Sequence, residues 1–300
     1  MTSNTIRINE VGLRDGLQSQ PRHLNLEQRL QLAASLMDAG LKHLEIGSFV
    51  SPKVVPQMAG TGELISALDV PPDVQLSALI PNMKGYELAR EAGIETVAVV
   101  VSATETMNQK NINMSLEKTL DVARAIIERG ASEGAKVQAY LAVAFECPFE
   151  GPTPQEVVIS QAAQLAEWGA HEIVIADTIG AANPAAVREL MNALVRTHGA
   201  DRLACHFHDT RAMGLANVFA AIESGVRQFD SSIGGLGGCP FAPGAKGNVA
   251  TEDVVMLCEQ MGFSTGVKMP ALLKSVELVG ESIGSPQGGR AHYWLSRNAA

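Results

Sequence analysis

The sequence predicts an α/β fold in which eight parallel strands alternate with helices. Eight apolar runs recur along the 300-residue chain, and several are almost continuously apolar, as strands covered on both faces are. Segments with helical periodicity lie between these runs, so successive strands can pair in parallel through right-handed crossovers. This alternation occupies roughly 260 residues, a length typical of a closed barrel.

The competing architecture is an open, doubly wound sheet. Such a sheet usually carries a glycine-rich phosphate loop after its first strand, whereas the first apolar run here is followed by LRDGLQ at 13–18. We therefore expect an eight-stranded parallel (β/α)8 TIM barrel with an additional C-terminal helix. We expect one domain over residues 1–300, with the barrel at about 5–263 and a C-terminal helical extension at about 264–300.

The apolar runs and the segments between them give the expected elements in chain order. Among the helical segments, 25–40 is the clearest, because Asn25 can cap it with Gln28 three residues on, and Gly40 can end it in a left-handed conformation. The expected strands are 5–11, 43–49, 74–80, 96–103, 136–145, 172–178, 203–209 and 228–235. The other expected helices are 115–130 (Ser115 cap, Gly130 stop), 153–169 (Thr153 cap, Pro154), 183–199 (Asn183 cap, Pro184) and, outside the eight units, 270–284.

Composition excludes several classes of function. The chain is 46% hydrophobic and 18% charged, with a net charge of −9, which argues against a general nucleic-acid or membrane-surface binder. No apolar run approaches the roughly 20 residues of a membrane span. The cysteines are widely spaced and form no CxxC pair, so we expect a reduced, cytoplasmic protein. They are Cys147, Cys205, Cys239 and Cys258.

In such a barrel, active sites form where strands end, and this directs attention to Arg14 and Asp15 just after the first strand. The simplest interpretation of this pair is a surface ion pair. Neighbouring residues on an extended strand point to opposite sides, however, so we expect Arg14 and Asp15 to pair poorly with each other. They would then be available to hold a metal ion and an anionic substrate.

The segment CHFHDT at 205–210 ends the seventh expected strand. His206 and His208 are two residues apart and therefore share one face of a strand, which is a spacing typical of metal ligands. Two hydrogen-bonded core histidines are an equally good interpretation of this motif alone. Asp209 can orient one imidazole as a supporting partner.

The glycine-rich segment 234–248 follows the last expected strand and contains a single thiol, Cys239. Pro240 and Pro243 stiffen it, unlike a flexible linker, so it can order over a substrate as a lid. Cys239 is then either an inert thiol or an acid/base at the closing loop. Asn248 can cap the next helix or give its carbonyl oxygen to a metal.

Glu45 lies inside the second expected strand, between Leu44 and Ile46. A carboxylate in this position is costly unless it is paired. Arg14, from the neighbouring strand end, is the expected partner, and the pairing would fix the guanidinium for a substrate.

These strand ends converge on one predicted metal site. Asp15, His206, His208 and Asn248 would supply two oxygens and two nitrogens, leaving two positions of an octahedron open. Mixed, oxygen-rich ligation of this kind suits Mg²⁺ or Mn²⁺ better than a structural zinc. The open positions suggest that a substrate chelates the ion.

Several sequence motifs between about residues 7 and 267 resemble those of the 3-hydroxy-3-methylglutaryl-CoA lyase family. The glycine–cysteine loop is the most specific of them, since related condensing enzymes lack it. The family belongs to a superfamily of metal-dependent barrel lyases and acyl-CoA condensing enzymes. The motifs are EVGLRDGLQ, SFVSPKVVPQM, KNIN, CPFEGPT, DTIG, HFHDT, GGLGGCPFAPGAKGNVATED and TGV.

The resemblance implies retro-Claisen cleavage of an acyl-CoA to acetyl-CoA and acetoacetate, as in leucine degradation, by a homodimer. The family's metal ligands fall on the four residues named above, its arginine on Arg14, its acidic partner on Glu45 and its cysteine on Cys239, with His206 or Cys239 moving protons. Departures at the strand mouths, among them Phe145 and Arg211, bear on which acyl group fits.

The alternatives are a lyase for citramalyl-CoA or a longer branched acyl-CoA, and an acyl-CoA condensing synthase. A non-enzymatic barrel that binds an acyl-CoA or a metal is the remaining one.

Overall fold

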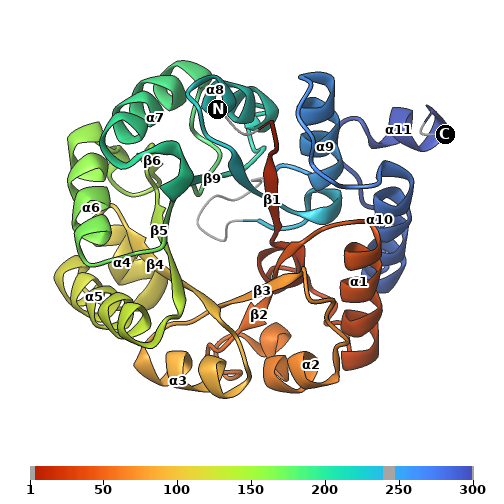
Figure 1. Cartoon of the computed structure of the whole chain (residues 1–300), viewed down its shortest axis with the longest axis horizontal. Helices are drawn as coiled ribbons and strands as arrows, with labels where there is room; N and C mark the ends of the chain where they lie inside the picture. Colours follow the sequence, from red (N-terminus) through yellow and green to blue (C-terminus); the bar gives the residue numbers. More distant parts are fainter. Residues whose placement is uncertain (1–3, 239–246, 299–300) are drawn as a thin grey trace.

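The eight-stranded closed barrel predicted from the sequence is confirmed. A computed structural model describes residues 4–238 and 247–298, and in it the strands follow the order β1-β10-β9-β8-β5-β4-β3-β2 with parallel pairing throughout. Figure 1 shows the helices forming a ring around these strands. The barrel strands are β1 (Arg7–Glu10), β2 (His43–Ser48), β3 (Gln75–Leu79), β4 (Thr96–Ser102), β5 (Lys136–Ala142), β8 (Glu172–Asp177), β9 (Leu203–Phe207) and β10 (Gln228–Ser231).

The helices pack their apolar faces on the outside of the barrel, where the main core lies. In α1 the predicted capping box of Asn25 and Gln28 is present, and Gly40 has the predicted positive φ of 97°. The described helices are α1 (Leu26–Asp38), α2 (Thr61–Ala67), α3 (Met83–Glu91), α4 (Glu105–Ile112), α5 (Leu116–Glu133), α6 (Gln155–Glu167), α7 (Pro184–His198), α8 (Gly214–Glu223), α9 (Thr251–Gln260), α10 (Met269–Ile283) and α11 (His292–Asn298).

Two predicted helix ends are wrong. Helix α5 continues past Gly130 and ends at Glu133, with Gly134 as its C-cap. Gly130 is needed for a different reason: the helix approaches β5 there, and a Cβ would lie 2.6 Å from Val137 Cγ2. Thr153 does not cap α6, since its hydroxyl donates to the Val143 carbonyl oxygen (2.7 Å) in the loop after β5. Gly130 and the Thr153 hydroxyl both serve contacts between different elements, which a local helix signal does not reveal.

The strand ends at the barrel mouth also differ from expectation. Strand β5 ends at Ala142, because Val143 has a φ of 51° and turns the chain into a short hairpin of β6 (Glu146–Cys147) and β7 (Gly151–Pro152). Strand β9 ends at Phe207, and His208 instead forms an isolated antiparallel bridge with Asn248.

The opposite end of the barrel is closed by polar side chains. Arg7 forms an ion pair with Glu172, and Gln138 donates to the same carboxylate (2.8 Å). His43 lies beside them, and burial, with help from Arg7 and Lys136, lowers the pKa of its imidazole to about 4.

The lowered pKa of His43 predicts a loss of stability in mild acid. The unfolded chain binds the proton near pH 6.5 and the folded chain only near pH 4, so the free energy of unfolding falls as the pH drops through this window. We expect His43→Gln to flatten this pH dependence, measured by urea unfolding at pH 7 and pH 5. An equally steep pH dependence in His43→Gln would contradict this assignment.

The C-terminal extension contains the predicted helix as α10 and also α11, which the sequence did not suggest. The segment before α11 is attached to the barrel mouth. Arg290 Nε donates to Asp209 Oδ2 (2.7 Å), and the Gly289 amide donates to Glu252 Oε1 (2.7 Å) at the start of α9. Within the described residues, no helix is long and apolar enough to cross a membrane.

Candidate active site

The turn that follows β1 carries Arg14 and Asp15 and is held by a buried glutamate. Residues Gly12–Gly16 form one π-helical turn. Glu10 Oε1 accepts hydrogen bonds from the amides of Gly12 (2.7 Å) and Ile233 (2.8 Å), which ties the turn to the segment after β10. A Cβ at position 12 would lie 2.5 Å from that oxygen, so this anchor requires a glycine.

The expectation that Arg14 and Asp15 pair poorly is wrong. Arg14 Nη1 donates to Asp15 Oδ1 at 2.7 Å, because the two residues lie on a helical turn rather than on an extended strand. The contact expected between Arg14 and Glu45 is present, with Arg14 Nε donating to Glu45 Oε2 at 2.6 Å. Both side chains are buried, so the guanidinium is fixed in the mouth by carboxylates on two sides.

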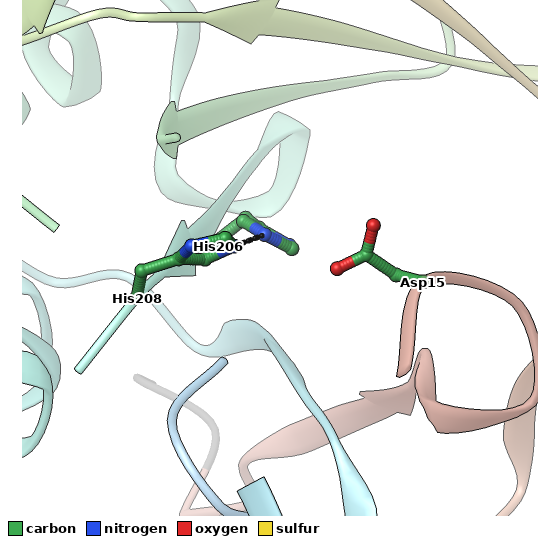
Figure 2. Close-up of side chains that lie close together, drawn as sticks. All are labelled: Asp15, His206 and His208. Atoms are coloured by element: carbon green, nitrogen blue, oxygen red, sulfur yellow. Dashed lines mark hydrogen bonds between the residues drawn. The ribbon is translucent and has the colours of Figure 1, made fainter. Parts of the chain in front are cut away.

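The two histidines lie together across the mouth from Asp15. Figure 2 shows the Asp15 carboxylate pointing toward the imidazoles of His206 and His208. The Nε2 atoms of the histidines are 3.1 Å apart, and one potential ligand atom from each of the three residues lies within 4.8 Å of the others.

Asp230, which no sequence motif had indicated, orients His206. Asp230 Oδ2 lies 3.0 Å from His206 Nδ1 and accepts the hydroxyl of Tyr140 (2.9 Å), while Asp230 Oδ1 accepts the amide of Asn9 (2.9 Å). The carboxylate therefore fixes the Nδ1–H tautomer and leaves the Nε2 lone pair facing the mouth. Asp209, the predicted orienting residue, instead accepts from Gly214 N and Arg290 Nε.

Asn248 joins the same cluster. Its Nδ2 donates to Asp15 Oδ2 (2.6 Å) and to the Leu236 carbonyl oxygen (3.0 Å), while its Oδ1 is buried without a hydrogen-bond partner among the described residues. It does not cap α9, whose N-cap is Ala250. Gly237 approaches so closely, at a φ of 124°, that a Cβ there would lie 2.5 Å from Asn248 Nδ2.

These groups fit a divalent cation. A buried carbonyl oxygen without a partner is costly unless something binds it, and with Asp15 and the two neighbouring imidazoles the Asn248 oxygen forms a mixed oxygen and nitrogen set. Burial alone would raise the pKa of Asp15, but Arg14 and the two histidines lower it to about 2, so the carboxylate is ionised. Burial and then His206 lower the pKa of His208 to about 4, so this imidazole is neutral, as a metal ligand must be.

Asp230 should therefore act through His206. We expect Asp230→Asn, which disturbs the tautomer of His206, to weaken Mn²⁺ binding about 10- to 100-fold, the usual effect of losing a ligand's carboxylate partner. Tyr140→Phe removes a hydroxyl from the same carboxylate but leaves the histidine contact, and should change affinity far less. Electron paramagnetic resonance titration with Mn²⁺ measures both. Equal affinities in wild type and Asp230→Asn would exclude this role.

Of the residues expected at the site, Arg14, Asp15, Glu45, His206, His208 and Asn248 lie together at the mouth. Cys239 lies outside the described residues. The sequence did not predict three residues of the site: Asp230, Tyr140 and Asn9. Asp230 could have been predicted, because it is a carboxylate inside a buried strand, as Glu45 is.

Comparison with known families and proteins gives a consistent result. Residues 5–279 match the HMGL-like family. The chain is 41% identical over 285 residues to a hydroxymethylglutaryl-CoA lyase of Bacillus subtilis, which covers 95% of each chain. It is 40% identical over 286 residues, again 95% of each, to a 3-hydroxy-3-isohexenylglutaryl-CoA/hydroxymethylglutaryl-CoA lyase of Pseudomonas aeruginosa.

Solved structures agree with these relatives. The crystal structure of a hydroxymethylglutaryl-CoA lyase from Pseudomonas aeruginosa superimposes with a TM-score of 0.95 and 39% identity, covering 99% of each chain. An HMG-CoA lyase from Acinetobacter baumannii in complex with coenzyme A and 3-methylmalate gives a TM-score of 0.93 and 35% identity, covering 99% of this chain and 96% of that one.

Proposed function

The chain belongs to the HMGL-like family, and from this premise we propose that the residues at its barrel mouth carry out the lyase reaction. The protein is a carbon–carbon lyase that cleaves 3-hydroxy-3-methylglutaryl-CoA to acetyl-CoA and acetoacetate. The observation that best supports the proposed site is the approach of Asp15, His206, His208 and the unpartnered Asn248 oxygen at the end of the barrel where such enzymes act.

Asp15, His206, His208 and Asn248 would hold a divalent cation, and such an ion would lower the pKa of the substrate's tertiary hydroxyl and orient the bond to be broken. Arg14 donates to the thioester oxygen as negative charge develops there when the carbon–carbon bond breaks. Glu45 and Asp15 hold the guanidinium in place for this role.

Protons must leave the hydroxyl and reach the enolate carbon, and His206 and Cys239 were both expected to move them. Asp230 engages His206 Nδ1, and Nε2 faces the ion site, so the contacts of His206 support the ligand role better than the proton-carrying role. We assign the proton transfers to Cys239.

Loss of this thiol gives a direct test. We expect Cys239→Ala to lower turnover by at least about 10²-fold, as for a positioned acid/base, and to leave Mn²⁺ affinity nearly unchanged. Steady-state assay of acetyl-CoA release and a metal titration measure the two effects. Wild-type turnover in this variant would remove Cys239 from the mechanism. Cys239→Ser, which replaces the thiol with a hydroxyl of similar shape, serves as the control.

The activity itself is tested with the purified protein, Mg²⁺ and 3-hydroxy-3-methylglutaryl-CoA. A longer branched substrate, such as a 3-hydroxy-3-isohexenylglutaryl thioester, is the second candidate, because a 40% identical relative carries that name. Faster cleavage of the longer substrate would reverse the order of preference. Consumption of acetyl-CoA with a 2-oxo acid would instead indicate a condensing synthase.

The remaining assignments are parts of the same proposal. The ligand set of two oxygens and two imidazole nitrogens, without a thiolate, favours Mg²⁺ or Mn²⁺ as the cation. Three buried free cysteines, Cys147, Cys205 and Cys258, suit a reduced compartment, and we place the enzyme in the cytoplasm, in leucine degradation, as a homodimer.

A further inference from the structure

Residues 285–291, the C-terminal strap, join α10 to α11 and bind through their backbone to the first turn of α9. The Gly289 amide donates to Glu252 Oε1 at 2.7 Å. The next two amides of the strap donate to the two oxygens of Asp253, at 2.6 and 3.0 Å. Glu252 is fully buried and Asp253 is 2% exposed. Both carboxylates have therefore left water and depend on these amides as hydrogen-bond partners.

Glu252 also holds the turn Ile233–Gly235 (η4), which follows β10. Its second oxygen, Oε2, accepts from the Gly234 amide (3.1 Å), and the Gly288 amide of the strap donates to the Gly234 carbonyl oxygen (3.3 Å). Gly234 has a φ of 63°, and a Cβ there would lie 2.9 Å from Gln287 Cβ, so the strap and the turn are in direct contact. One carboxylate therefore fixes the strap and the turn in one relative position.

The turn leads directly to the groups that orient the Asn248 amide. Leu236, its C-cap residue, accepts from Asn248 Nδ2 (3.0 Å) through its carbonyl oxygen, and Gly237 packs against the same nitrogen. These contacts fix the direction of Nδ2 and with it that of Oδ1, the buried oxygen proposed as an ion ligand. Because the side-chain amide is planar, a displacement of Leu236 turns Oδ1 away from the ion position.

We propose that the C-terminal strap positions this ligand oxygen and that Gly289 is the positioning residue, an inference that rests on the proposed function. The connection runs from the Gly289 amide through the carboxylate of Glu252 to the turn after β10, and from there to Asn248. The C-terminal extension, which lies outside the eight barrel units, is then part of the support of the ion site.

Gly289→Ala tests this connection directly. The added Cβ would lie 2.5 Å from Asp253 Cγ and 2.6 Å from Ala250 Cβ, so the strap must move away from α9. Gly289 does not have a positive φ, so alanine adds no backbone strain of its own. We expect Mn²⁺ to bind about tenfold more weakly than in wild type, measured by electron paramagnetic resonance titration, as for loss of a group that supports a ligand. Val187→Ala, which trims a buried side chain of α7, should lower thermal stability without changing Mn²⁺ affinity.

Two further variants separate the connection through Glu252 from the ion pair of the strap. Glu252→Gln keeps the shape of the side chain, but its NH₂ group cannot accept, so the amide of Gly234 or of Gly289 loses its partner. Mn²⁺ binding should weaken as it does in Gly289→Ala. Arg290→Gln removes only a half-exposed contact with Asp209, and affinity should stay within about threefold of wild type. Equal losses in Arg290→Gln and Gly289→Ala would contradict the connection through Glu252.

A double-mutant cycle identifies the ligand on which the strap acts. If the strap acts through Asn248, Gly289→Ala should not weaken Mn²⁺ binding further in an Asn248→Ala background. Its effect should instead add to that of Asp230→Asn, which acts on His206. A full tenfold loss from Gly289→Ala in the Asn248→Ala background would overturn the proposal.

The metal-free protein gives a measurement that does not depend on the proposed reaction. In protein labelled with ¹⁵N-asparagine, the side-chain NH₂ resonance of Asn248, identified by its absence in Asn248→Ala, reports the hydrogen bonds of Nδ2. We expect this resonance to shift in Gly289→Ala and Glu252→Gln and to stay in place in Arg290→Gln. An unchanged resonance in the first two variants would overturn the role of the strap even if the lyase is active. A shifted resonance, with a wild type that binds no Mn²⁺, would reject the proposed ion site and retain the role of the strap in placing Asn248.

Discussion

Replacing Arg14 with methionine is expected to lower turnover of 3-hydroxy-3-methylglutaryl-CoA by about 10³-fold or more. Loss of one oxyanion donor typically costs about 10²- to 10³-fold, and here the donor also carries a full charge in a buried site. Arg14 Nη1 donates to Asp15 and Nε donates to Glu45, which leaves Nη2 for the proposed contact with the thioester oxygen. That oxygen carries more negative charge in the transition state than in the bound substrate, so the loss should appear in kcat rather than in KM.

The same substitution leaves Glu45 buried without its cation, which by itself destabilises the fold. The double variant Arg14→Met with Glu45→Gln removes the unpaired charge and separates the two effects. We expect its thermal stability to recover toward wild type while turnover remains low. Arg14→Lys keeps a charge, but one ammonium group cannot bind both carboxylates as the planar guanidinium does. Its turnover should therefore lie between those of the wild type and Arg14→Met. Turnover within tenfold of wild type in the double variant would contradict a role for the guanidinium in the reaction.

The parts of the site that the sequence predicted share one property: they follow from strand direction. In a parallel barrel every strand ends at the same mouth, so polar residues just after β1 and at the end of β9 must approach one another, whatever their separation in the chain. The pairing of Arg14 with Glu45 was predictable for a related reason, because a carboxylate inside an apolar strand needs a partner.

The parts that the sequence did not predict depend on local backbone shape and on residues inside the barrel. The contact between Arg14 and Asp15 requires the π-helical turn, which is stabilised by Glu10 and by a segment more than two hundred residues away. Asp230 and Tyr140 meet only because the barrel closes and brings β10 and β5 to opposite sides of His206. Neither contact has a signature at short sequence range.

The second large effect is expected at the ion. Asp15 is the only anionic side chain of the proposed ligand set, and its pKa of about 2 keeps it ionised at any working pH. Asp15→Asn keeps the shape and removes the charge. We expect Mn²⁺ affinity to fall at least about 10²-fold, because loss of a residue that only supports a ligand already costs about 10- to 100-fold and Asp15 is proposed as a ligand itself. We also expect turnover to fall about 10³-fold or more, since a metal contributes several kcal/mol to such a transition state.

Two measurements distinguish this from a general loss of negative charge at the mouth. Asp209→Asn removes a carboxylate next to His208, but that carboxylate faces Arg290 and the start of α8, so Mn²⁺ affinity should stay within about threefold of wild type by the usual size of distant charge effects. Saturating Mn²⁺ should restore part of the turnover of Asp15→Asn but none of that of Arg14→Met, because only the first variant is limited by ion occupancy. If Asp15→Asn also bound Mn²⁺ like the wild type, the cation would have to bind elsewhere, and the unpartnered oxygen of Asn248 would need another explanation.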